Sequence, residues 1–356
     1  MDGKSVSGFT SLGFDEFLAK WQRCRDVYAG SERVKERGAK YLPMSRWHAG
    51  SDEGKADYEA FKQRAVFHNY LKDAIKTMLG VLSKGEPTIE LPNQLAFMAN
   101  SATPYKDGLV ALNGRLNATI LLVGCAGLSL EVNWSGSGTA DAPDFYINMW
   151  QPETIRDKDF TSDSMTGETF AKFVLLDESD LVFNYATKQR ESVRRWRVMA
   201  LDGQNRYYTA LIDPEQWVDF DIDNPPLADD PTNPPTGYAV YPQYRGETFN
   251  RVPFTFVNST DLSGGHFQDP PLLELVDLVL ALYRGDADYR QTLHFTASDF
   301  YKHTGIQGEI NNQNVVVGAG GIAHLPEGFT LSPAACAISA TAPATAFRLG
   351  STARRA

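Results

Sequence analysis

The chain has 356 residues but few cysteines, and no spacing pattern connects them. Cys24, Cys125 and Cys336 lie far apart in sequence, their number is odd, and no CxxC pair occurs. These features exclude a disulfide scaffold and a zinc ribbon, and they favour a reducing compartment.

Long hydrophobic runs are also lacking. The best membrane candidate, residues 118–128, is about half as long as the ~20 residues that a bilayer-spanning helix needs. The first residues contain no apolar stretch of the kind that secretory signals carry. We therefore expect a soluble intracellular protein with no membrane partner.

The chain has no excess of positive charge. Residues 101–327 contain 31 acidic and 16 basic side chains, whereas residues 1–100 carry a net charge of +2 and the last 29 residues carry +3. A net-negative body repels a phosphate backbone at long range, which excludes a conventional nucleic-acid binder. A protein that encloses DNA without gripping it remains compatible with this charge.

Apolar residues at three- and four-residue spacing predict four helical segments. The first covers about residues 14–28 and stops at Gly30, and the second is one unbroken helix over about 55–84. A third runs over 105–123, and the fourth, another single long helix, runs from Asp269-Pro-Pro-Leu towards residue 298.

The middle of the chain changes to the short alternating or apolar runs that are typical of strands. Six prolines make residues 225–242 an irregular, protruding loop with few backbone hydrogen bonds. The predicted strands cover residues 128–134, 144–150, 171–176, 193–201, 207–212, 217–223, 251–257 and 314–317.

These segments predict an α+β fold in which long helices flank a β-rich middle. No internal repeat is present. The expected division is a helical region 1–100, a helix-containing region 101–130, a β-rich region 131–260 with the proline loop 225–242, a long helix 269–300, strands in 301–331, and an alanine-rich disordered tail 332–356.

Residues 318–323 match G-x-G-x-x-A, the fingerprint of dinucleotide-binding loops. That chemistry requires a helix whose N-terminal amides meet the pyrophosphate, and an acidic residue about 20 positions further on a second strand. Pro326 and Gly328 break such a helix, and no second strand follows. We therefore expect a glycine turn here and no nucleotide cofactor.

Asp219, Asp221 and Asp223, with Asp230 at the twelfth position, resemble a calcium loop. The sixth position, which needs glycine for a sharp turn, is Asn224, and two prolines follow. The alternation of these acids with Phe220 and Ile222 fits a half-buried strand with a solvated acidic face.

Other candidate sites are equally weak. The six histidines, at positions 48, 68, 266, 294, 303 and 324, show no metal-ligand spacing, and no GxSxG or Walker A motif occurs. The basic cluster at residues 190–197 suits a solvated face or inter-subunit salt bridges better than DNA contact. We predict no catalytic, cofactor-binding or metal-binding residues.

The order of several short motifs, over roughly residues 40–331, resembles the portal proteins of tailed phages, and in particular a poorly characterised portal-like branch. Each motif is weak alone, and their order and spacing carry the resemblance. They are Tyr41-Leu42-Pro43, Tyr58 to Asn69, Met78 to Pro87, Ile147 to Trp150, Val252 to Phe254, Asp269 to Leu275, Tyr283-Arg284, Ala287-Asp288, Val315 to Gly318 and Leu325 to Gly328.

The resemblance implies a ring of twelve subunits, each with a wing, a stem of long helices and a β-containing clip. It would make residues 1–100 and 301–331 wing-like, 101–130 and 269–300 stem-like, and 131–260 the clip-containing region. The implied function is a head–tail connector at the capsid vertex through which dsDNA is packaged and ejected.

The resemblance also implies partners and locations. The subunit would bind its own copies, a major capsid or scaffolding protein, a terminase that hydrolyses ATP, and a head–tail adaptor, while dsDNA passes without sequence recognition. It would be found in the virion, and in the host cytoplasm during assembly. Such a subunit is not itself an enzyme.

One departure from the family concerns the C-terminal end. Portals of this type continue through further helices, whereas residues 332–356 are rich in alanine, so we expect a truncated or frameshifted product. The isolated chain is then expected to aggregate or to form incomplete rings. Two other classes stay open: an enzyme with dispersed active-site residues, and a non-portal minor head or adaptor protein.

Overall fold

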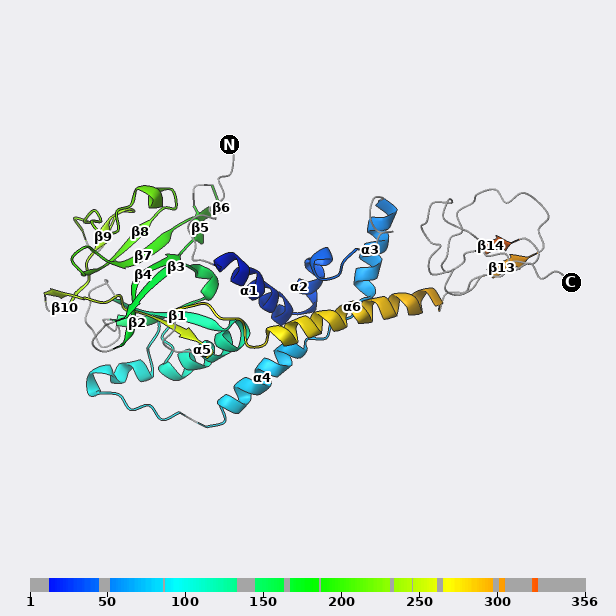
Figure 1. Cartoon of the computed structure of the whole chain (residues 1–356), viewed down its shortest axis with the longest axis horizontal. Coiled ribbons are helices and arrows are strands. Elements are labelled where there is room, and N and C mark those ends of the chain that lie inside the picture. Colours follow the sequence, from blue (N-terminus) through cyan, green and yellow to red (C-terminus); the bar gives the residue numbers. More distant parts are fainter. Residues whose placement is uncertain are drawn as a thin grey trace. The chain divides into compact units, whose positions relative to one another are not determined.

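A computed structural model describes most of the chain. The described residues are 13–44, 52–85, 87–132, 145–162, 167–185, 187–230, 234–244, 246–260, 265–296, 301–304 and 322–325. They form α-helices and mainly antiparallel sheets, which confirms the expected mixture of helical and β-rich regions (Figure 1).

The helices come before and after the main run of strands. The α-helices are α1 (Phe14–Ala29), α2 (Ser31–Glu36), α3 (Asp52–Arg64), α4 (Tyr70–Leu82), α5 (Leu109–Val123) and α6 (Leu273–Thr296). Short 3-10 helices are η2 (Gly38–Lys40), η4 (Asn93–Ala99), η5 (Pro152–Thr154) and η6 (Gln216–Asp219).

Most strands lie between α5 and α6. They are β1 (Cys125–Val132), β2 (Phe145–Trp150), β3 (Ile155–Ser162), β4 (Thr169–Asp177), β5 (Asp180–Asn184), β6 (Gln189–Val193), β7 (Trp196–Leu201), β8 (Tyr207–Ile212), β9 (Ala239–Val240), β10 (Gln243–Tyr244), β11 (Glu247–Thr248) and β12 (Phe254–Asn258). β13 (Tyr301–Thr304) and β14 (Ile322–Leu325) follow α6 and pair in parallel.

The chain divides into two compact units, and both are discontinuous in sequence. One comprises the described residues of Met1–Tyr28 and Leu71–Val276, and the other those of Ala29–Tyr70 and Asp277–Ala356. The helical region predicted for residues 1–100 is therefore shared between the two units.

The first unit contains two main sheets. One has the strand order β12-β1-β2 and the other β3-β4-β7-β8-β9, and all neighbouring strands are antiparallel. The larger sheet holds a core of Leu175, Trp196, Val198, Ala200, Tyr208, Ala210, Ile212 and Ala239. Strands rich in β-branched and aromatic residues supply this core because their side chains pack well on a pleated surface.

Two glycines fix the join between α5 and the smaller sheet. Gly124 adopts a left-handed conformation (φ 87°) and its N–H bonds to the Ile120 carbonyl at 2.8 Å, which ends the helix. A Cβ on Gly127 would come within 2.5 Å of the Phe254 ring, so close packing of β1 on β12 requires glycine there. Helix α5 therefore ends at Val123, where the helix predicted over 105–123 was expected to end, and strand begins at Cys125.

Aromatic packing attaches α1 to the loop before α6. Trp21 contacts the Phe267 ring edge-on at 5.0 Å between centroids, and Phe14 and Phe17 surround the same ring. The Lys158 ammonium lies 3.5 Å from the Phe256 centroid and 3.4 Å from that of Phe267. Burial lowers the pKa of Lys158 to about 7, because the charged form loses water without gaining a hydrogen bond.

The second unit is built around the C-terminal part of α6. The Arg284 side chain donates to the Tyr41 carbonyl at 2.9 Å, and the Tyr58 hydroxyl donates to the Leu42 carbonyl at 2.7 Å. Phe67 packs edge-on against Tyr283 at 5.6 Å. These contacts join the segments around α2 and α3 to α6 within one unit.

The predicted single helix over residues 55–84 is wrong. α3 ends at Arg64, residues 65–69 belong to neither a helix nor a strand, and α4 starts at Tyr70. Ala65 and Phe67 are both buried, and side chains two residues apart share a face in extended chain but not in a helix. Tertiary burial of both side chains therefore decides the break, and Asn69, a favoured N-cap residue, precedes α4.

The predicted long helix after Asp269 is confirmed. α6 runs unbroken for 24 residues, and Figure 1 shows it as one continuous helix. Val276, Val279, Leu280, Tyr283 and Ala287 are buried along one side, as their spacing predicts.

Residues 217–223 are not a strand. They form η6 followed by a bend, in which the Asp221 carboxylate accepts the N–H groups of Asp223 and Asn224 at 3.0 and 3.2 Å. Such local bonds compete with a ladder. The expected alternation is nevertheless present, since Phe220 and Ile222 pack on the core and the three aspartates are exposed.

The proline loop 225–242 is more ordered than predicted. Its Ala239 N–H bonds to the Pro226 carbonyl at 2.7 Å, Ala228 bonds back to Ala239 at 3.0 Å, and Gly237 donates to Leu211 at 2.7 Å. β9 also pairs with β8. The donors are the non-proline residues, which keep the N–H groups that the neighbouring prolines lack.

The strands β1, β2, β4, β7, β8 and β12 overlap predicted strands, while β3, β5, β6, β9, β10, β11, β13 and β14 do not. Arg194 and Arg195 connect β6 to β7, so the strand predicted to begin at residue 193 begins at Trp196. The predicted strand 314–317 and the tail 332–356 lie outside the described residues.

Candidate functional site

A polar ladder lies on one face of the antiparallel pair β1–β2. Glu131 stands opposite Tyr146 and Ser129 opposite Asn148, so the two-residue period of the strands brings the four side chains together. The Glu131 carboxylate accepts hydrogen bonds from Ser129 at 2.9 Å, Asn148 at 3.2 Å and Tyr146 at 3.0 Å. The buried Trp150 indole extends the chain by donating to Ser129 at 2.7 Å.

Arg197 adds a positive charge from β7. Its guanidinium forms a two-pronged contact with Glu178, with donor–acceptor distances of 2.7 and 3.2 Å. Burial lowers the pKa of Arg197, but the Glu178 and Glu131 carboxylates outweigh burial and raise the pKa above its usual value. Arg197 is thus a permanent cation at this end of the site.

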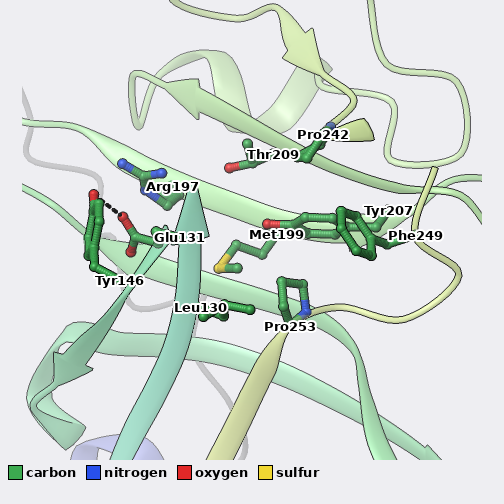
Figure 2. Close-up of a pocket in the computed structure, with 10 residues that line it drawn as sticks. All are labelled: Leu130, Glu131, Tyr146, Arg197, Met199, Tyr207, Thr209, Pro242, Phe249 and Pro253. Carbon is green, nitrogen blue, oxygen red and sulfur yellow. Dashed lines mark hydrogen bonds between the residues drawn. The ribbon is translucent and has the colours of Figure 1, made fainter. Parts of the chain in front are cut away.

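These residues form the polar end of a cavity of about 140 Å³ between the two main sheets (Figure 2). Figure 2 shows Glu131, Tyr146 and Arg197 together at one side and the rings of Tyr207 and Phe249 at the other. The lining residues are Leu130, Glu131, Tyr146, Arg197, Met199, Tyr207, Thr209, Pro242, Phe249 and Pro253.

The cavity is suited to recognition more than to proton transfer. Burial, followed by the nearby Glu131 carboxylate, raises the pKa of Tyr146 to about 12, so its hydroxyl stays protonated at neutral pH. Burial also raises the pKa of Tyr207. A mainly apolar cavity with a few fixed polar groups at one end is the usual form of a site that binds an amphipathic group.

A second cavity, of about 650 Å³, lies beside the β7–β8 turn. Its most buried charge is Asp202, which accepts from the Gln204 and Arg206 N–H groups, the Arg206 side chain and the Tyr241 hydroxyl at 2.8–3.1 Å. Burial raises the pKa of Asp202, but these bonds together hold it below its usual value. The network holds the turn together and explains the ionised carboxylate there.

The β5–β6 hairpin (residues 180–193) exposes apolar side chains that other strands bury. Leu181, Val182, Phe183 and Tyr185 are all exposed, and Tyr185, just after β5, is 87% exposed. The hairpin forms a two-stranded sheet of its own. Exposed apolar groups gathered in this way mark interaction sites.

A second exposed apolar surface lies on α6. Leu278, Leu282, Tyr289 and Leu293 are spaced so that they share one side of the helix, opposite the buried stripe. We call this set the outer face of α6. Soluble helices usually carry polar residues there, so the pattern indicates a surface that a partner covers.

Two of the sequence motifs contribute to the cavities: the acidic run supplies Asp223 and Asn224 to the lining of the second cavity, and the basic cluster supplies Arg197 to the first. The glycine-rich match and the histidines supply no residue to either lining. Residues 322–325, the end of the glycine-rich match, form β14, so no helix begins there. His68, His266 and His294 are exposed. Among the described residues, no group of three or more histidine, cysteine, aspartate or glutamate side chains is arranged to hold a metal ion.

The basic cluster at residues 190–197 divides into two environments. Arg190, Arg194 and Arg195 are exposed, whereas Arg197 is the partly buried partner of Glu178. The ion pair with Glu178 therefore accounts for Arg197, while the other three arginines of the cluster are exposed on or next to the β5–β6 hairpin.

Sequence reasoning missed the Glu131–Tyr146–Arg197 group. The alternating polar positions in β1 and β2 were a usable signal, but pairing them requires the register of two strands, and the segment 133–144 between them is too long to fix that register by a tight turn. In the comparison with protein families, residues 271–344 match the model described as Domain of unknown function (DUF4055). No curated protein matches the chain.

Proposed function

We propose that this chain is the subunit of a tailed-phage portal, a ring at the capsid vertex that acts as head–tail connector and lets dsDNA pass during packaging and ejection. In this role it binds further copies of itself, capsid or scaffolding protein, a head–tail adaptor and a terminase. The terminase supplies ATP hydrolysis, and the portal needs no catalytic residues.

The observation that carries the proposal is α6. It is an unbroken 24-residue helix at the position where the resemblance expects a stem helix, and it has two apolar sides. One side packs within its own unit, and the outer face is exposed. Neighbouring subunits packed side by side would cover such a face.

The order of elements gives further support. α5 precedes the β-rich segment and α6 follows it, as expected for two stem helices that bracket a clip-containing region. The family match includes all of α6 and continues past Leu331 to residue 344. No helix among the described residues has the length and apolar character needed to cross a bilayer.

Charge is also compatible with a DNA conduit. Residues 101–327 have a net charge of −15, and a strongly attractive channel would slow a moving polyphosphate. The proposal therefore expects DNA to be enclosed without tight binding.

Size measurement tests this proposal. Light scattering with size-exclusion chromatography, followed by negative-stain electron microscopy, should show self-assembly into rings, closed at about twelve subunits or incomplete as the departure at the C-terminal end predicts. The double variant Leu278→Arg/Leu282→Arg should abolish rings, and Asp288→Arg, an exposed polar position on the same helix, should not. A monomer at all concentrations would overturn the proposal and favour the enzyme alternative.

A further inference from the structure

We propose that the β5–β6 hairpin of one copy inserts Tyr185 into the cavity between the two main sheets of a second copy. This inference rests on the proposed function in one respect, since it assumes that the chain assembles with itself. It identifies the two surfaces that meet.

The inserted residue is the most exposed large apolar side chain of the hairpin. Tyr185 contacts Phe183 edge-on at 5.3 Å, which restricts the direction of both rings while 87% of Tyr185 stays exposed. Tyrosine combines a large apolar ring with a polar end at low entropic cost, and it is enriched among residues that dominate interfaces.

The receiving cavity has the size of one aromatic ring. Its volume is about 140 Å³, and a cavity of about 150 Å³ in another protein accommodates benzene. Leu130 and Phe249 at its lining are 42% and 41% exposed, so the cavity is open to solvent at this side.

The polar end of the cavity matches a phenol. The Arg197 guanidinium can donate a hydrogen bond to a phenolic oxygen, and the Glu131 carboxylate can accept a hydrogen bond from the phenolic O–H group. A tyrosine would therefore place its ring among Met199, Phe249 and Pro253 and its hydroxyl at the charged end. A phenylalanine would fill the apolar part only.

Charge favours a second copy as the partner. Lys188, Arg190, Arg194 and Arg195 are exposed around the hairpin, and none of the four forms an ion pair within the described part of the chain. The region that contains the cavity, residues 101–327, has a net charge of −15. A basic apolar hairpin is thus complementary to the acidic body of another copy.

The contact is heterologous, because hairpin and cavity are different patches of one chain. Every subunit then has one inserting tyrosine and one receiving cavity. Repetition of the contact from subunit to subunit either closes into a ring or continues as a filament. This property allows a mixing experiment that a symmetric dimer interface would fail.

Two variants block the two halves of the contact separately. Tyr185→Ala removes the inserting side chain. Leu130→Trp fills the receiving cavity from a lining position that is already partly exposed. Each variant alone should weaken self-association about thirtyfold, as expected for a dominant interface residue. Tyr105→Ala, at another highly exposed tyrosine, should change nothing.

An equimolar mixture of the two variants should form a one-to-one heterodimer in sedimentation velocity. The Leu130→Trp chain still has its tyrosine, and the Tyr185→Ala chain still has its cavity. Circular dichroism checks that each variant folds. If Leu130→Trp does not fold, Phe249→Asp replaces it as the variant that blocks the receiving cavity. Tyr185→Phe should retain part of the affinity.

The outcomes separate this inference from the proposed function. Closed rings that neither variant disturbs would overturn the hairpin contact and leave the portal proposal intact. Open filaments that both variants abolish would support the contact and contradict the ring. A mixture that stays monomeric although the unmodified chain associates would also overturn the contact, and an unmodified chain that is always monomeric would overturn both.

Discussion

The five-stranded sheet and the β5–β6 hairpin belong to one continuous ribbon, yet they use apolar residues in opposite ways. The β4–β7 ladder ends at Asp177 opposite Trp196, and the Glu178 N–H donates to the Arg195 carbonyl at 2.8 Å before the hairpin pairing begins. Within the sheet the ribbon is flanked by β3 and β8. Beyond it no further strand pairs with the hairpin among the described residues.

This difference shows what neighbours contribute to a strand. Val198 and Ala200 of β7 are buried because β8 and the segment after it cover them, whereas Leu181 and Phe183 of β5 have similar apolar character and remain exposed. An isolated hairpin is only marginally stable in water. The apolar residues of the sheet therefore stabilise the fold, and those of the hairpin are available to a partner.

The largest expected effect contrasts one residue from each region. Ile212→Ala on β8 removes a fully buried side chain and should lower the free energy of unfolding by about 2–5 kcal/mol. Leu181→Ala on β5 should change it by less than about 0.5 kcal/mol. Urea denaturation of both variants measures the two changes in the free energy of unfolding. Equal changes would mean that the apolar residues of the hairpin stabilise the fold as much as those of the sheet.

The next effect concerns a charge inside the sheet region. Lys158→Met should raise the free energy of unfolding by about 1–4 kcal/mol at pH 7 and below, because it replaces a buried ammonium by an apolar chain of similar length. The folded pKa of about 7 lies below the unfolded value of 10.5. Between these values the unfolded chain holds the extra proton, so the stability of the unmodified protein rises with pH.

The advantage of Lys158→Met should therefore shrink as pH rises from about 7 to about 10.5. Lys172→Met, at an exposed position on the neighbouring strand β4, is the control and should show no such trend. A pH-independent gain for Lys158→Met would mean that the ammonium is hydrated in the folded state.

A smaller effect should come from the turn that joins β7 to β8. Asp202→Asn should cost about 1–3 kcal/mol at pH 7, because it leaves donors around the carboxylate poorly matched. The pKa of Asp202 is depressed, so its stabilisation is complete above the unfolded value of 3.8 and is lost as pH falls through the folded value. The difference from the unmodified protein should narrow at acid pH, and the exposed Asp229→Asn should be neutral throughout.

The last prediction concerns local stability, which we expect to be lowest in the hairpin itself. Its backbone amides should exchange through local opening, with much lower protection than those of β7 and β8, because few buried apolar contacts hold it. Hydrogen exchange of the unmodified monomer at low concentration measures this. Protection should increase on self-association, and equal protection of hairpin and sheet in the monomer would contradict the comparison.

Much of the fold was accessible from local pattern. The 3.6-residue spacing of Val276, Val279, Leu280 and Tyr283 predicted α6, and Gly124 marked the end of α5. These features depend on residues close in sequence. The break at 65–69 was not accessible, because Ala65 and His68 continue the helical spacing of the apolar residues on both sides of it. The break depends on the contact of Phe67 with Tyr283, which is far away in sequence.

The candidate site also separates into features that neighbouring residues determine and features that depend on residues far apart in sequence. Charge and periodicity are properties of the chain alone, so the acidic body, the helices around a β-rich middle and the inward placement of Phe220 and Ile222 could be predicted from the residues. The cavity that Glu131, Tyr146 and Arg197 share, and the exposure of Tyr185, could not be predicted in this way. The reason is physical: strand register and the presence or absence of a neighbouring strand depend on contacts between residues far apart in sequence.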